Sequence, residues 1–124
     1  MEYQQPDLPA IPVNYNGFHD TCEFIDSWAA TVFSVSYEMI VIDNGSTANE
    51  AALLQKTYPF IQAVRSERNL GFAGGNNQGI NLAKGKYLFL LNNDVCMVKD
   101  AIPLLIKRLL SSDKIAGVSP LIRD

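Results

Sequence analysis

Residues 38–47 read Glu38-Met39-Ile40-Val41-Ile42-Asp43-Asn44-Gly45-Ser46-Thr47, an apolar run that ends abruptly in small and polar residues. This pattern predicts a strand over 38–42 that is buried in a sheet. Similar runs cover residues 10–15, 60–64 and 86–91. The strand centres lie roughly 25 residues apart with helical patterns between them, which is typical of βαβ units. The fold class expected is therefore α/β, with a mostly parallel sheet and helices on both faces in three layers.

Four helices are expected around these strands. The first covers residues 20–33 and places Trp28 in the core, and the second runs from Ser46 or Thr47 to Tyr58. The third covers Gly75–Lys84 with Gly85 as its C-cap, and the fourth covers Ala101–Leu110. His19 and Asp20 are expected to cap the first helix. Pro12 removes a hydrogen bond from an inner strand, so the first strand should be short, displaced or begin only at Val13. Residues 115–118 predict a fifth strand.

Length and composition predict one ordinary domain over residues 1–124, with an irregular start at 1–9. The net charge is -3 and the basic residues are scattered, which argues against nucleic acid as a partner. No apolar run approaches the roughly 20 residues of a membrane span, and the first residues lack a secretory signal, so the cytoplasm is the expected location. Cys22 and Cys96 have no CxxC spacing and are expected to be reduced, buried thiols.

Polar clusters follow all four predicted strands. Because parallel strands joined by right-handed crossovers end at one edge of the sheet, these clusters should meet in a single crevice. They are Tyr15-Asn16-Gly17, Asp43-Asn44-Gly45-Ser46, Arg65-Ser66-Glu67-Arg68-Asn69 and Asn92-Asn93-Asp94.

Each cluster by itself has two interpretations. Asp43 either starts the next helix as an Asx turn or accepts hydrogen bonds from a nucleobase or a ribose. The triplet of residues 92–94 is either a plain turn or a set of oxygen ligands for Mg²⁺ or Mn²⁺. The glycine-rich residues 69–77 form either a flexible loop or a helix start that favours a diphosphate.

Taken in order and spacing, four motifs resemble family 2 glycosyltransferases, closest to the non-processive, rhamnosyltransferase-like members, over about residues 13–120. They are Val13-Asn14-Tyr15-Asn16-Gly17, Val41-Ile42-Asp43-Asn44-Gly45-Ser46-Thr47, Asn69-Leu70-Gly71-Phe72-Ala73-Gly74-Gly75-Asn76-Asn77 and Leu90-Leu91-Asn92-Asn93-Asp94. The resemblance implies a GT-A fold that binds a nucleotide-diphosphate sugar, usually with Mg²⁺ or Mn²⁺.

The resemblance also implies a set of site residues. Asp43 would contact the base or ribose and Asp94 would be the metal-side carboxylate, while Asn92 replaces the first Asp of the commonest metal motif and should weaken metal binding. The residues implied for the nucleotide sugar are Asn14, Tyr15, Asn16, Asp43, Asn44, Gly45, Ser46, Asn69, Gly71, Phe72, Gly74, Asn76, Asn77, Asn92 and Asn93. It assigns no catalytic base.

The chain ends at Asp124, about where the acceptor half of the resembled family begins. We therefore expect the nucleotide-binding half of a glycosyltransferase, which in the complete enzyme would transfer sugar to a saccharide or lipid-linked glycan with inversion. The acidic residues Glu23, Asp26, Glu50 and Asp113 are expected away from the crevice, so this chain alone should transfer nothing. An uncovered strand edge predicts a homo-oligomer. The alternatives are a non-catalytic nucleotide-sugar-binding module and a purely structural α/β domain.

Overall fold

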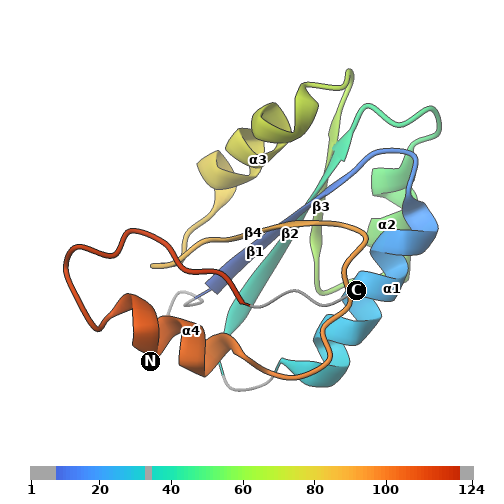
Figure 1. The fold of residues 1–124 in the computed structure, drawn as a ribbon. Coiled ribbons are helices and arrows are strands. Elements are labelled where there is room, and N and C mark those ends of the chain that lie inside the picture. Colours follow the sequence, from blue (N-terminus) through green and yellow to red (C-terminus); the bar gives the residue numbers. More distant parts are fainter. Residues whose placement is uncertain (1–7, 33–34, 121–124) are drawn as a thin grey trace, which may run out of the picture.

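The computed structural model describes residues 8–32 and 35–120, which form an α/β fold around one sheet (Figure 1). The four strands of the sheet are all parallel and lie in the order β3-β2-β1-β4. They are β1 Leu8–Asn14, β2 Tyr37–Asn44, β3 Gln62–Ser66 and β4 Phe89–Asn92. The parallel sheet expected from the apolar runs is confirmed.

Helices cover both faces of the sheet, as expected. They are α1 Phe18–Thr31, α2 Glu50–Thr57, α3 Gly71–Leu82 and α4 Ile102–Leu109. Figure 1 shows α3 alone on one face and α1 with α2 on the other. From α4, Ile102, Leu105 and Ile106 join the apolar cluster beneath α1. The arrangement therefore has three layers.

The larger apolar core lies between the sheet and α1, around the fully buried side chain of Trp28. Its ring centroid lies 5.9 Å from that of Phe24, 5.5 Å from Tyr37 and 5.7 Å from Phe89. Tilted and edge-on pairs at these distances add to the energy gained from burying the rings. The expectation that Trp28 belongs to the core is confirmed.

The smaller core lies beneath α3 and is built on Ile11, Ile40 and Ile42. Glycines let α3 lie close to the sheet, because a Cβ added at Gly79 would stand 2.4 Å from Ile11 Cγ2. This close packing fixes α3 over β1 and β2, so the start of α3 lies near the ends of those two strands.

The first strand is longer than expected at its start. It includes Leu8 and Pro9, which the sequence placed in an irregular segment, while residues 1–7 of that segment lie outside the described residues. β1 is an inner strand between β2 and β4, and its paired register with β2 skips Ile11 and Pro12. Proline has no N–H to donate, so the interruption falls where a ladder bond is missing. The strand is preserved because the register with β4 is continuous there, Pro12 matching Leu91.

The helices α1, α2 and α3 each differ from the prediction by two or more residues at one end at least. α3 begins at Gly71 instead of Gly75 and ends at Ala83 in an extended conformation, so Gly85 is not its cap. α2 begins at Glu50, capped by the Asn49 side chain, which accepts a hydrogen bond from the Ala52 N–H at 3.1 Å. Ser46 and Thr47 lie before α2. The Ser46 hydroxyl binds Asp43 and the Asn16 N–H, and the Thr47 N–H donates to Asn16 Oδ1.

α1 starts two residues earlier than expected, after Gly17 and without a side-chain cap. His19 and Asp20 are therefore residues of the helix and do not cap it; His19 Nε2 lies 3.1 Å from Glu23 Oε1 one turn on. Phe33, the expected last residue of this helix, lies outside the described residues.

The fifth strand expected over residues 115–118 is wrong, because these residues have no strand conformation. β4 pairs with β1 alone in the described sheet, and a strand needs a ladder partner to form. The two cysteines are free, but only Cys22 is half-buried; Cys96 is exposed, so the expectation that both are buried is wrong. Among residues 8–32 and 35–120, no helix is long and apolar enough to cross a membrane.

Candidate functional site

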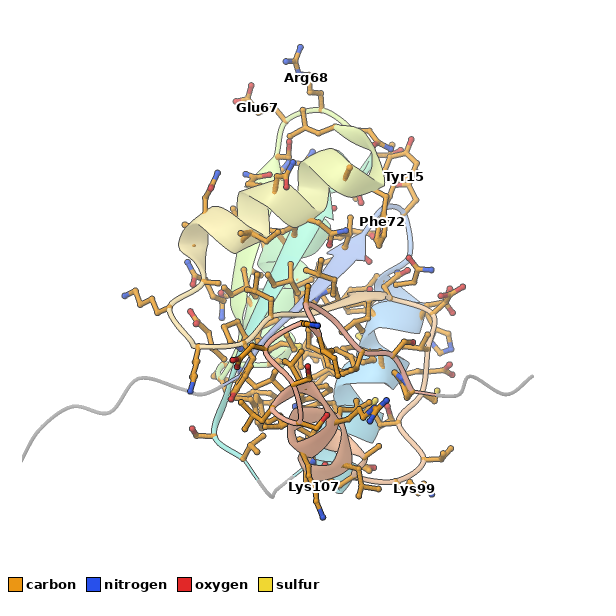
Figure 2. All side chains as sticks on the ribbon, turned by 60° about the vertical axis from the view of Figure 1, so that its left-hand side comes forward. Tyr15, Glu67, Arg68, Phe72, Lys99 and Lys107 are labelled. Atoms are coloured by element: carbon orange, nitrogen blue, oxygen red, sulfur yellow. The ribbon has the colours of Figure 1, made fainter. Side chains whose placement is uncertain are left out.

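The polar clusters that follow the strands lie together at the carboxyl edge of the sheet. Asn14, Asn44 and Ser66 are the last residues of β1, β2 and β3, and Asn92 ends β4. Figure 2 shows Tyr15 and Phe72 at this end of the molecule, with Lys99 and Lys107 at the opposite end. Tyr15 and Phe72 are 51% and 52% exposed, so two aromatic faces are open to a ligand here.

Asp43 lies at the centre of this edge and has no exposed surface. Its Oδ2 accepts hydrogen bonds from the Ala51 N–H at 3.0 Å and from Arg65 Nη1 at 3.2 Å. Its Oδ1 accepts from the Ser46 hydroxyl and from Asn14 Nδ2, the latter at 3.3 Å. A carboxylate has about four lone-pair positions, and all of them are used.

The position of Asp43 differs from the expected role in direct contact with a base or ribose. A ligand could bind this carboxylate only by displacing one of its four protein donors. In the described conformation Asp43 instead holds the loop of residues 45–48 onto the end of β2, because Ser46, Ala51 and Arg65 all bond to it.

Glu50 belongs to the site, although the sequence analysis placed it away from the crevice. It is the first residue of α2, and its Oε1 accepts from Asn14 Nδ2 at 3.0 Å and from the Gly17 N–H at 3.1 Å. The sequence could have predicted this place for Glu50, because it lies in the first turn of a helix that follows a strand, and such a turn lies at the carboxyl edge of the sheet.

Arg65 is a second residue whose role was missed. Its Nη1 donates to the Ala48 carbonyl at 2.8 Å and its Nη2 to the Ser46 carbonyl at 3.0 Å, in addition to its contact with Asp43. The guanidinium thus closes the loop between β2 and α2 from outside. A planar fork of donors suits this task, which a lysine could not perform at the same three acceptors.

Asn16 and Ser46 join the loop after β1 to the loop after β2. The Asn16 N–H donates to Ser46 Oγ at 2.8 Å, and Asn16 Oδ1 accepts from the Thr47 N–H at 2.9 Å. Asn16 has a φ of 48°, in the left-handed region where asparagine is tolerated better than most residues. The first two clusters are therefore one connected surface.

Asn44 connects the same surface to the glycine-rich segment. Its Nδ2 donates to Asn69 Oδ1 at 3.1 Å and to the Gly71 carbonyl at 2.9 Å, while its Oδ1 accepts from the Leu70 N–H at 2.9 Å. Gly45 is closely packed here as well: at a φ of 79°, an added Cβ would lie 2.5 Å from Asn69 N.

The remaining predicted residues of that segment lie in the first turns of α3. Phe72 and Asn77 are exposed, Gly74 is half-buried, and Asn76 is buried with an Oδ1 that has no hydrogen-bond partner among the described residues. Of the two interpretations of residues 69–77, the helix start is confirmed, and it lies at Gly71 instead of Gly75. The start of a helix directs free N–H groups toward the same edge.

The side chains of residues 92–94, at the end of β4, differ in their exposure to solvent. Asn92 and Asp94 are exposed, whereas Asn93 Nδ2 points inward. It donates to Thr21 Oγ1 at 3.0 Å and to the Gly17 carbonyl at 3.4 Å.

The Asp94 carboxylate is free of partners in the described part of the chain: no hydrogen bond or ion pair joins it to another described residue. The described chain holds no group of three acidic, histidine or cysteine side chains that could bind a metal ion. One free carboxylate with amide neighbours fits a hard cation that takes its other oxygens from a phosphate-bearing ligand.

Comparison with known proteins agrees with this geometry. The family model for glycosyl transferase family 2 matches residues 10–124. The chain is 33% identical over 86 residues to a chondroitin synthase of Pasteurella multocida, covering 68% of this chain and 9% of that protein. It is 28% identical over 104 residues to the succinoglycan biosynthesis protein ExoO of Rhizobium meliloti, covering 83% of this chain and 30% of that one. The chain thus spans less than a third of either relative.

Among solved structures, S. aureus TarS is similar with a TM-score of 0.69 at 20% identity, over 83% of this chain and 32% of the TarS chain. That likeness supports the GT-A form of the α/β fold that the motifs implied. The family model covers nearly the whole sequence and includes all four motifs at the carboxyl edge. The chain belongs to glycosyl transferase family 2.

Proposed function

We propose that this chain binds a nucleotide-diphosphate sugar at the carboxyl edge of its sheet, as the donor-binding part of a glycosyltransferase. The observation that carries the proposal is the hydrogen-bonded connection of the loops after β1 and β2 and the start of α3 through Asn16, Asp43 and Asn44. A structural domain would not need buried polar side chains to tie several loops together, because such groups cost energy unless fully satisfied.

In this proposal Asp43 and Asn44 act from beneath the surface. They hold the backbone of residues 45–48 and 69–71, and the nucleoside lies on that backbone between the half-exposed rings of Tyr15 and Phe72. Two further residues named for the donor, Asn16 and Asn77, present exposed amide groups around it. This assignment keeps the predicted donor site and gives Asp43 a positioning role in it.

The cation would be Mg²⁺ or Mn²⁺, held by the Asp94 carboxylate together with oxygens of the diphosphate. When bound there, such an ion supplies positive charge that stabilises the departing diphosphate. Asn92 and Asn93 offer neutral amide oxygens beside it, so the affinity of the protein alone should be weak and the diphosphate should supply the rest.

In the complete enzyme, an acceptor hydroxyl on a saccharide or a lipid-linked glycan would form a new bond to the anomeric carbon as the bond from that carbon to the diphosphate oxygen breaks. Attack from the opposite side inverts the anomeric centre. The acceptor hydroxyl would lose its proton to a carboxylate base, a role that we assign to no residue of this chain. The cytoplasmic location stays a prediction.

Calorimetry with UDP and dTDP tests the donor site and its metal dependence together. We expect at least one of the two to bind in Mn²⁺ and to bind about tenfold more weakly in EDTA, a loss of about 1.4 kcal/mol. Asp94→Asn should remove most of that difference because the one free carboxylate is gone.

Asp113→Asn is the matched control, since Asp113 is exposed on the loop after α4 and should bind as the parent does. Equal affinity for the diphosphate in Mn²⁺ and in EDTA would overturn the metal site. Failure of the chain to bind either nucleotide under both conditions would overturn the donor site itself and favour a structural domain.

A further inference from the structure

Thr21 belongs to none of the motifs, yet it joins two of them. It lies in the first turns of α1 and has no exposed surface. Its hydroxyl donates to Asn14 Oδ1 at 2.7 Å and accepts from Asn93 Nδ2 at 3.0 Å. A single buried hydroxyl thus lies between the end of β1 and the triplet that follows β4.

The direction of these hydrogen bonds is determined by two carboxylates. Asn14 Nδ2 faces Asp43 Oδ1 and Glu50 Oε1, and an ionised carboxylate can only accept. The amide oxygen of Asn14 must therefore face Thr21, whose one hydroxyl proton goes to it. Thr21 then has only lone pairs left for Asn93, so Asn93 must present its nitrogen to Thr21.

This order leaves the other atom of the Asn93 amide free. Asn93 Oδ1 makes no hydrogen bond within the described part of the chain and is not among its buried unpartnered atoms. It is an available oxygen in the residue next to Asp94. Amide oxygens are ordinary ligands of hard cations, whereas an amide nitrogen in the same position would repel them.

Gly17 provides an independent constraint on the same amide. A Cβ added at Gly17 would lie 2.6 Å from Asn93 Nδ2, and the Gly17 carbonyl is 3.4 Å from that nitrogen. Any side chain at position 17 would therefore displace the Asn93 amide. The φ of -135° there is negative, so an alanine would not meet the penalty of a left-handed backbone.

We propose that Thr21 is a positioning residue for the cation site: with Gly17, it turns the Asn93 amide so that its oxygen is a second protein ligand beside Asp94. This inference rests on the proposed function, because the cation is the one that accompanies the nucleoside diphosphate. It also gives a site with a single carboxylate a second oxygen of fixed orientation.

The test measures the manganese enhancement, defined as the dissociation constant for the diphosphate in EDTA divided by that in Mn²⁺, using UDP and dTDP as probes. Thr21→Val keeps the shape of the side chain and removes the hydroxyl, so we expect the roughly tenfold enhancement of the parent to fall to about threefold, because Asp94 remains while its oriented partner is lost. Thr21→Ser keeps the hydroxyl and should restore it. Thr57→Val, on the exposed face of α2, is the matched control.

Gly17→Ala provides a second route if Thr21→Val fails to fold. It leaves the Thr21 hydroxyl in place, displaces the Asn93 amide, and should lower the enhancement by a similar factor. Asn93→Ala sets the lower limit, and combining it with Thr21→Val should cause no further loss if the two residues act through one ligand.

The outcomes separate the two proposals. A parent chain that binds neither probe in Mn²⁺ overturns the proposed function and this inference together. A parent with normal enhancement whose Thr21→Val and Gly17→Ala variants keep it overturns the role of Thr21 alone. Equal loss in Thr21→Val and Thr21→Ser would also overturn it, since the hydroxyl would then not be the cause.

Discussion

The carboxylate of Asp43 shows how much one residue can determine at this edge of the sheet. It is fully buried and bonded to four donors from four different residues, Asn14, Ser46, Ala51 and Arg65. Asn14, Ser46 and Ala51 are buried, so their donors depend on this acceptor, whereas the more exposed Arg65 also donates to two backbone carbonyls. Asp43 therefore affects the stability of the fold and the shape of the proposed donor site at the same time.

Replacing Asp43 with alanine should lower the free energy of unfolding by about 3 kcal/mol, because the donors of Asn14, Ser46 and Ala51 lose their acceptor inside the protein and Arg65 loses its ion-pair partner. Urea denaturation followed by circular dichroism measures this change. Asp113→Ala, at an exposed position, should change it by less than about 0.5 kcal/mol. If Asp43→Ala and Asp113→Ala have the same unfolding midpoint, the buried network does not stabilise the chain.

The two cysteines should differ in reactivity. Burial raises the pKa of the Cys22 thiol above its usual value, whereas Cys96 is exposed on the segment after β4. Because the thiolate is the reacting form, a disulfide reagent such as DTNB should label exposed Cys96 quickly and Cys22 slowly, and the Cys22 rate should continue to rise with pH beyond the usual pKa of a thiol. Cys96→Ser should remove the fast phase. Retention of that phase in Cys96→Ser would show that Cys22 is open to the reagent.

The sequence predicted which residues gather at the site better than it predicted what each one does. A polar cluster after a buried strand indicates its place in the fold, because strand direction decides where the cluster lies. Whether Asp43 faces a ligand or the interior depends on donors from residues 14, 51 and 65, which are distant in sequence. Glu50 and Thr21 were missed for the same reason, since their partners lie on other elements.

At the scale of elements, Gly45 in the loop after β2 packs against the backbone of the loop that leads into α3. A Cβ there would lie 2.5 Å from both Arg68 C and Asn69 N, which are backbone atoms that cannot move aside cheaply. Gly71 has a similar positive φ of 77°, but an added Cβ would meet nothing within 4 Å. Comparing substitutions at the two glycines therefore distinguishes the cost of a left-handed backbone from the cost of a steric clash.

Gly71→Ala should cost about 1 kcal/mol of stability for its left-handed backbone alone. Gly45→Ala should cost about 1 to 3 kcal/mol more, because it also forces the two loops apart. Urea denaturation of both variants gives the difference directly. Nucleotide affinity should fall in Gly45→Ala, since the loop of residues 45–48 moves away from Asn69. Equal stability of the two variants would mean that the loops are not in tight contact.

Element boundaries show where local patterns were insufficient. The apolar runs predicted all four strands, because burial on both faces requires continuous apolar residues in a parallel sheet. α3 began earlier than its sequence suggested, since glycines are poor helix formers in isolation. Its first turn is instead held by Asn44, which binds Leu70 N and the Gly71 carbonyl from β2. The fifth strand failed because an apolar run alone provides no ladder partner.

For the molecule as a whole, β3 and β4 are the edge strands of the described sheet, and apolar side chains are exposed beside β4. This strand pairs with β1 alone in the described sheet, and Leu90 on the strand and Leu88 just before it are each 47% exposed. An apolar groove lies along the same region, lined by Leu8, Tyr87, Phe89, Leu105, Ile106 and Val118 among others. An exposed edge with apolar side chains readily pairs with another strand.

We expect the chain to self-associate through this edge, and the weight-average mass to fall on dilution in sedimentation velocity experiments. Leu90→Lys places a charge on the exposed edge and should shift the equilibrium toward monomer, because edge charges oppose strand pairing. Leu104→Lys adds the same charge on α4, at a side chain that is 68% exposed, and should leave the association unchanged if the strand edge is responsible. Equal weakening by both substitutions would indicate general apolar association. Dimers with micromolar dissociation constants form at about 100 μM, so a parent that stays monomeric at that concentration would contradict the expectation.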